Sequence, residues 1–291
     1  MRRIKLEILI LIIMNTHVWG ALSFLTVFSF AAARLSLNTT RNNDDHKQKK
    51  STDELVLLGT KAGPAVRGVG LSTMPSANLL DLGSHRIIVD CGLGVTRAIV
   101  DAKRSVKSVT HIFITHYHSD HMLELAGLLH TMWTTGLKHQ VHVYGPDGLA
   151  DVWNGFLLMM NFDLKLRQQD EGRPDIRDLV RIHIYTEGLI CSQVDEKTTT
   201  TIPKQTNNNN QEEMVSTRNI LKVSALRNKH PPIQETYSLK FEYGGKIITF
   251  SGDTTYFPPL AEFAKGFILF FYFFPFSMCV GASVCLCQDV S

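Results

Sequence analysis

The feature that most constrains this chain is a dense run of metal-binding side chains within six residues: His116, His118, Asp120 and His121. The run follows a strand-like apolar segment at residues 110–115 and precedes a helix-like segment at 122–129. Imidazole nitrogens and carboxylate oxygens are the ligands that zinc and similar divalent ions prefer. Because side chains alternate in an extended turn, we expect His116 and His118 to point to one side. Asp120 and His121 would then open the following helix, where they can face a second ion. The run therefore predicts half of a two-metal site rather than a histidine-rich surface loop.

Length and composition allow one substantial domain with appendages. The chain has 291 residues and 44% apolar residues, enough to bury a sizeable core. Its net charge of +3 does not indicate a basic nucleic-acid surface, and we expect no specific nucleic-acid partner. The five cysteines are scattered, and their spacing matches neither a disulfide framework nor a zinc knuckle.

The N-terminus has the pattern of a targeting segment. A basic start at residues 2–5 is followed by an apolar stretch, and three alanines at 31–33 resemble a cleavage site. We expect a secretory signal peptide over residues 1–33, with an uncleaved signal anchor as the alternative. The protein would then be secreted or lumenal, or tethered to a membrane through this segment. Asn38 lies in a glycosylation triplet that fits that side of the membrane. Residues 34–54 are polar and predict a linker.

From residue 55 the hydrophobic pattern predicts a layered α/β domain. Strand-like runs occur at 55–58, 78–82, 86–90, 110–115, 140–144, 179–185, 223–226, 238–243 and 246–250. Helical spacing occurs at 95–105, 122–133 and 149–160. Alternation of these two kinds of element is typical of an α/β architecture. Residues 192–217 are poor in apolar side chains and rich in Thr and Asn, which predicts a disordered insertion on a surface loop.

Several motifs in order resemble the metallo-β-lactamase superfamily over roughly residues 55–265. They are Leu-Gly-Thr at 58–60 with Pro64, Asp-Cys-Gly at 90–92, the His-rich signature at 116–121, Lys-His-Pro-Pro at 229–232 and Ser-Gly-Asp-Thr at 251–254. The style of these motifs is closest to the ribonuclease Z and arylsulfatase branch. The resemblance implies an αββα sandwich with the metals at one edge of its two sheets.

The resemblance also implies a ligand set for two zinc ions. One zinc would be held by His116, His118 and His230. The other would be held by Asp120 and His121, and Asp253 would bridge the two ions. Paired cations of this kind activate a shared water and neutralise a developing oxyanion. Asp120 could accept a hydrogen bond from that hydroxide and orient it, which would make Asp120 a catalytic residue. Asp90 is better placed as a hydrogen-bond partner of a ligand histidine than as a ligand.

The chain departs from the family near its C-terminus. Residues 266–291 form an apolar, aromatic-rich tail, where the family supplies further structure and a last histidine for the second metal. The tail predicts either a truncated variant or a short membrane span. We expect one or two zinc ions and a hydrolase acting on a small-molecule or ester substrate, namely a phosphodiester or a sulfate ester. Lactone, β-lactam or thioester hydrolysis is an alternative within enzymes. A non-catalytic or inactive, membrane-tethered protein is the alternative from another class.

Overall fold

The structure is a computed structural model that describes residues 34–36, 53–64, 74–204, 213–266, 269–273 and 282–285. The predicted signal segment and Asn38 lie outside these residues. Within the described part, no helix combines the length and the apolar character needed to cross a membrane.

The first sheet has seven strands in the order of the chain, β1 to β7. Their bounds are β1 Arg34–Ser36, β2 Glu54–Gly59, β3 Ala77–Leu82, β4 His85–Val89, β5 His111–Phe113, β6 Val141–Gly145 and β7 Val180–Ile184. Strands β1 to β4 pair antiparallel, whereas β4 to β7 pair parallel. The carboxyl ends of β4 and β5 therefore meet at one edge of the sheet.

The second sheet has six strands in the order β13-β12-β11-β10-β9-β8. Their bounds are β8 Gly188–Lys204, β9 Glu213–Arg227, β10 Tyr237–Tyr243, β11 Lys246–Asp253, β12 Leu269–Phe273 and β13 Ala282–Cys285. Strands β8 to β11 form antiparallel pairs, and β12 pairs parallel to β11. Strand β11 is an inner strand of this sheet, and it ends at Asp253.

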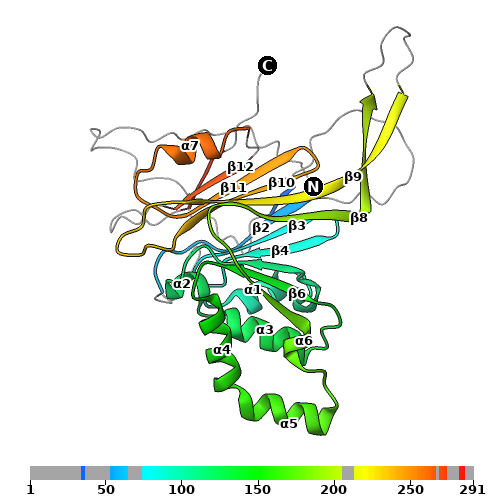
Figure 1. Cartoon of the computed structure of the whole chain (residues 1–291), viewed down its shortest axis with the longest axis vertical. Helices are drawn as coiled ribbons and strands as arrows, with labels where there is room; N and C mark the ends of the chain where they lie inside the picture. The colour runs from blue at the N-terminus through cyan, green and yellow to red at the C-terminus, as the bar shows by residue number, and fades with distance from the viewer. Residues whose placement is uncertain are drawn as a thin grey trace, which may run out of the picture.

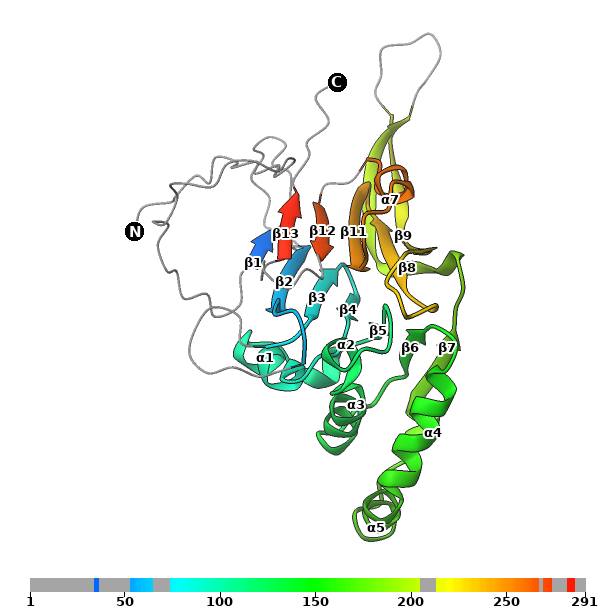
Figure 2. The same cartoon turned by 90° about the vertical axis from the view of Figure 1, so that its left-hand side faces the viewer.

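Most helices lie on the outer side of the first sheet, and one short helix lies beside the second sheet (Figure 1). The helices that follow the strands of the first sheet are α1 Val95–Asp101, η1 Val106–Ser108, α2 Ser119–Met122, α3 Leu125–Thr134, α4 Leu149–Met159, α5 Asn161–Glu171 and α6 Ile176–Leu179. Helix α7 Pro259–Phe263 lies against the second sheet. Figure 2 shows α4 and α5 extending away from the sheets. The layers are those of the expected αββα sandwich.

Alternation along the strands of the first sheet produces two cores. Leu79 and Ile88 point to the helical side and pack in one apolar cluster. Their neighbours Leu80 and Ile87 point to the second sheet and pack in another, because successive strand side chains face opposite sides. Phe113 joins the two sheets: its ring stacks on Tyr144 with centroids 4.6 Å apart and meets Phe241 of β10 edge-on at 5.2 Å.

A row of histidines crosses the first sheet at the start of its parallel strands. The buried His111 lies between His85 and His142, with ring centroids 5.5 Å from each. Its Nε2 lies 2.8 Å from the side-chain oxygen of Gln193 on β8. Burial first, and then the neighbouring His85, lower the pKa of His111 to about 3, although the Gln193 hydrogen bond opposes this shift. His111 is therefore neutral near pH 7.

Three segments differ from what the sequence predicted. The predicted disordered insertion at 192–217 is wrong where it is described, because β8 and β9 pair as far as Lys204 and Glu213. This hairpin extends beyond the sheet (Figure 2). The segment is rich in threonine, a β-branched residue that is enriched in strands. The predicted linker begins with β1, which pairs with β2. The apolar tail supplies β12 and β13, so its first residues extend the second sheet.

We expect Phe113→Ala to lower the free energy of unfolding by about 3–5 kcal/mol, because it removes the ring that packs between the sheets. Urea denaturation of the purified chain measures this loss. Leu158→Ala, at a side chain that is 79% exposed on α4, is the control and should change stability by less than about 0.5 kcal/mol. Equal losses of stability for the two substitutions would contradict the role of Phe113 in packing the two sheets together.

We expect His111 to make the folded chain less stable in acid. An unfolded histidine has a pKa near 6.5, whereas the pKa of folded His111 is about 3. Between these values the unfolded state binds the proton, so stability falls as the pH falls, by up to about 1.4 kcal/mol per pH unit. Denaturation midpoints of wild type and His111→Gln, compared from pH 7 to pH 4, should show a shallower acid slope in the variant. Equal acid slopes in wild type and His111→Gln would show that His111 does not cause the loss of stability in acid.

Candidate metal centre

The signature segment lies at the edge where β4 and β5 end. Strand β5 stops at Phe113, and the chain passes through His116 and His118 before α2 begins at Ser119. Asp120 and His121 belong to this single helical turn. Because β4 runs parallel to β5, the residue that follows β4, Asp90, reaches the same edge.

The second sheet brings two more side chains to this edge. His230 lies on the loop after β9, and Asp253 is the last residue of β11. The pairing of β11 with β12 shifts register between Phe250 and Asp253. Within this irregular segment, Gly252 has a φ of +59°, and a Cβ built there would lie 2.7 Å from the carbonyl oxygen of Tyr237. Only glycine fits this backbone without a shift, and the resulting bend aims Asp253 at the histidines.

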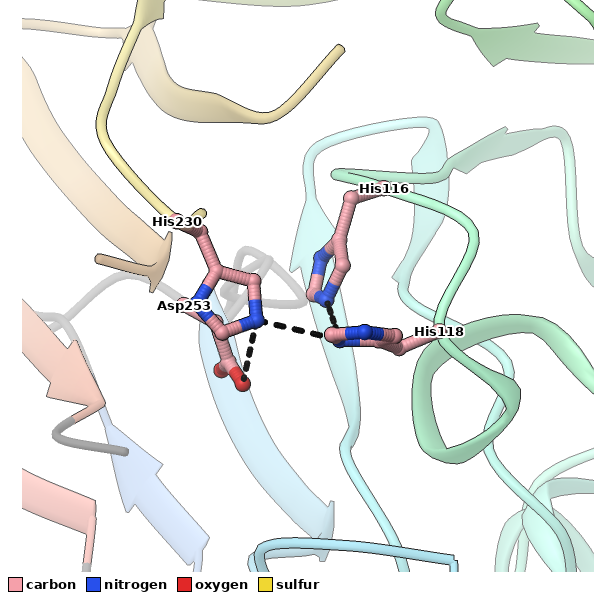
Figure 3. A group of neighbouring side chains, drawn as sticks. All are labelled: His116, His118, His230 and Asp253. Atoms are coloured by element: carbon pink, nitrogen blue, oxygen red, sulfur yellow. Dashed lines mark hydrogen bonds and ion pairs between the residues drawn. The ribbon is translucent and has the colours of Figure 1, made fainter. Parts of the chain in front are cut away.

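Three imidazoles and one carboxylate converge on the first group of donors (Figure 3). The four residues are His116, His118, His230 and Asp253, and their ligand atoms all lie within 4.8 Å of one another. The Nδ1 of His118 lies 3.1 Å from Nε2 of His116 and 3.0 Å from Nε2 of His230. One carboxylate oxygen of Asp253 lies 3.8 Å from Nε2 of His230.

The second group consists of Asp120, His121 and Asp253, also within 4.8 Å of one another. The Nε2 of His121 lies 3.2 Å from one oxygen of Asp253 and 3.8 Å from an oxygen of Asp120. Asp253 thus belongs to both groups. Within the part of the chain that the structure describes, the second group comprises these three donor residues.

The charges of the centre are set by burial and by close opposite groups. Burial, and then the neighbouring His121, lower the pKa of His116 to about 2. Burial likewise lowers the pKa of His230. Burial also acts to lower the pKa of His121, but the carboxylates of Asp90 and Asp253 hold it well above its usual value. Burial opposes ionisation of Asp253, yet its contacts with His121 bring its pKa to about 2. His116 and His230 are therefore neutral imidazoles near pH 7.

Hydrogen bonds behind the donors orient them. Asp90 contacts Nδ1 of His121 at 2.7 Å and accepts the Thr115 backbone N–H at 2.8 Å. The Thr115 hydroxyl lies 3.0 Å from Nδ1 of His116 and 3.1 Å from both Asp90 oxygens. These contacts leave Nε2 of both histidines directed at the centre, as is usual for ligand histidines. Asp120 is held separately, because its Oδ2 accepts the backbone N–H of Gly63 at 2.6 Å.

The donor geometry fits a metal ion better than a hydrogen-bond network. Two zinc-bound nitrogens at about 2.0–2.1 Å from the ion, in tetrahedral geometry, lie about 3.3 Å apart, close to the separations found here. His118 Nδ1 faces two other imidazole nitrogens at once. One ring nitrogen cannot satisfy both by hydrogen bonds with ideal directions, since it carries either one proton or one lone pair. A cation between the three nitrogens removes this conflict.

The structure brings together all six predicted ligands, and it places Asp90 behind His121. Their roles as ligands, and the catalytic role of Asp120, stay predictions. Two contributors escaped sequence analysis: the hydroxyl of Thr115 and the backbone of Gly63. Thr115 directly precedes the signature, and this position could have indicated a role in the centre. Nothing in the sequence links Gly63 to Asp120. Away from the centre, His130 lies 2.8 Å from Asp163 and His139 lies 2.9 Å from the Val109 carbonyl.

Comparison with known proteins identifies a family and several relatives. A family model described as "Anti-Pycsar protein Apyc1" matches residues 54–271. Ribonuclease Z of Mycobacterium marinum (strain ATCC BAA-535 / M) is 25% identical over 217 residues, which cover 73% of this chain and 67% of that protein. A second relative of the same name, from Mycobacterium sp. (strain KMS), is 27% identical, and the match covers 65% of its length. The chain thus spans about two thirds of these relatives.

Among solved structures, the metallo-β-lactamase fold protein YhfI from Bacillus subtilis is similar with a TM-score of 0.47 and 16% identity. The similarity covers 74% of this chain and 69% of that one. The chain therefore belongs to the Anti-Pycsar protein Apyc1 family, and it is similar in sequence to proteins named ribonuclease Z.

Proposed function

We propose that this protein is a two-metal hydrolase that binds zinc and cleaves phosphodiester bonds. The observation that carries the proposal is the position of Asp253, which joins a group of three histidines to a second group made of Asp120 and His121. A shared carboxylate between two sets of donors is the arrangement that holds two ions close enough to act on one substrate.

The residues of the chain have distinct tasks in this reaction. Bound ions would lower the pKa of a shared water and neutralise charge that develops on the phosphoryl oxygens. Asp90 and Thr115 keep the ligand histidines in one orientation through their Nδ1 contacts. Asp120, held by the Gly63 N–H, presents its carboxylate as a hydrogen-bond acceptor that orients the attacking water. The neutral His116 needs no proton loss before it binds a metal ion.

The choice of phosphodiester rests on the relatives. The motif style and the ribonuclease Z relatives both favour attack on phosphorus, whereas the sulfate-ester reading rests on motif style alone. Lactone, β-lactam and thioester hydrolysis remain within the reach of such a centre, because one metal site serves several chemistries.

RNA is a second candidate substrate. The relatives named ribonuclease Z act on RNA, as their name states. Our expectation of no nucleic-acid partner, which rested on a net charge of +3, is therefore not supported. Overall charge is a weak guide here, since a substrate that binds directly to cations at the centre needs few basic side chains elsewhere.

Localisation is a separate part of the proposal. We infer entry into the secretory pathway from the basic and apolar pattern of residues 1–33. This inference rests on the sequence alone.

We expect the purified chain to hold about two zinc ions and to hydrolyse bis(4-nitrophenyl) phosphate. His116→Ala should lower the metal content by at least one ion and bring hydrolysis down to the rate of the buffer control. Elemental analysis and release of nitrophenol measure the two effects. His139→Ala, far from the centre, is the matched control and should retain both properties. A single ion without hydrolysis in the wild type would favour the non-catalytic alternative instead.

We expect the same protein to distinguish between ester classes. Hydrolysis of bis(4-nitrophenyl) phosphate should exceed that of 4-nitrophenyl sulfate and of a chromogenic β-lactam, and the activity should disappear on chelation. An unstructured RNA and a precursor transfer RNA, incubated in parallel, test the second candidate. Cleavage of RNA that depends on His116 would establish it, and sulfate-ester hydrolysis above phosphodiester hydrolysis would contradict the proposed class.

A further inference from the structure

We propose that Glu124 is a positioning residue that holds the turn bearing Asp120 and His121 and so tunes the second metal site. The inference rests on the proposed two-metal function and deepens it. Glu124 lies three residues after His121, outside the signature motif, and it is not among the metal donors.

The side chain of Glu124 closes the N-terminus of another helix, α1. Its Oε1 accepts the backbone N–H of Thr96 at 2.9 Å, and its Oε2 accepts that of Gly94. The N-cap of α1 is Gly94, which supplies no side-chain hydrogen bond, and the first turn holds no acidic residue. Free N–H groups and the partial positive charge at a helix start are stabilised by a carboxylate. Glu124 provides that carboxylate from a distance of about 30 residues along the chain.

The backbone around Glu124 is bonded to the same loop. The Glu124 N–H donates to the carbonyl of Cys91 at 3.0 Å, and the Cys91 N–H donates to the carbonyl of His121 at 2.6 Å. A Cβ built on Gly92 would lie 2.4 Å from the carbonyl oxygen of Asp120, so the two segments are in close contact. The loop at residues 91–94 therefore packs along the turn that carries the second donor group.

This turn has little stability of its own. Helix α2 comprises four residues, Ser119–Met122, and a single turn does not persist in isolation. Asp90 fixes its His121 side chain from one side. At the other side, Glu124 follows the C-cap residue Leu123 and is itself the N-cap of α3. Glu124 thus connects the end of α2, the start of α3 and the start of α1.

The first donor group depends less on this connection. His116 and His118 precede α2, and His230 comes from a loop of the other sheet. Loss of the Glu124 carboxylate should therefore disturb the second site selectively. A purely structural cap of α1 would instead lower stability without changing one metal site relative to the other.

The test is a zinc titration of the full chain against a chromophoric chelator, which resolves two dissociation constants. For Glu124→Ala we expect the second constant to rise by about 10- to 100-fold, the range typical for partners that orient ligands, while the first constant stays within about twofold of the wild type. Glu124→Gln keeps an oxygen that accepts one N–H, so it should lie between wild type and Glu124→Ala. Glu262→Ala, at an exposed carboxylate of α7 that pairs with Lys265, is the matched control and should leave both constants unchanged.

Hydrolysis provides an independent readout. Excess zinc should restore the activity of Glu124→Gln, with half-saturation at a higher zinc concentration than in the wild type. An unchanged second constant, or equal weakening of both sites, would overturn the role of Glu124. If Glu124→Ala does not fold, the two dissociation constants of Glu124→Gln test the role of Glu124 by themselves. Failure of the wild type to hold any ion would instead remove the two-metal function, and this inference with it.

Discussion

The buried carboxylate of Asp90 is the contact on which the rest of the centre depends. Asp90 follows β4 and has a φ of 64°, a left-handed conformation that aspartate tolerates better than most residues. From there it accepts the Thr115 N–H and contacts His121. One side chain thus joins the end of a strand, the start of the signature and a ligand histidine. Burial of this polar side chain is tolerated because it has hydrogen-bond partners on several sides.

Much of the sandwich could be predicted from hydrophobic alternation. The strands around Leu79 and Ile88 were identified because buried strands leave a clear two-residue pattern or a continuous apolar run. The outer part of the β8–β9 hairpin was missed because its sequence is mostly polar, and its pairing depends on backbone hydrogen bonds that no side-chain pattern reports. The β1 strand was missed for a related reason, since three residues are too short for a periodic signal.

The ligands could be predicted because they stand in recognisable motifs, in order along the chain. What could not be predicted is how the motifs meet. The bond from Gly63 to Asp120, and the reach of Glu124 to Gly94, join segments whose local sequences say nothing about each other. The net charge is a weak basis for an expectation about nucleic acids, because it averages over a surface and ignores what a local centre can bind.

The irregular end of β11 has a consequence for how such a centre can change. The backbone bends at Gly252, and this bend directs Asp253 toward the histidines. At Gly252 the carbonyl of Tyr237 leaves no room for a methyl group. A mutation at Gly252 would change none of the metal-binding residues, yet it would shift Asp253 and so separate the two donor groups. The shared ligand therefore depends on a residue that has no side chain, so a search for lost function in this protein should include a position that carries no chemistry of its own.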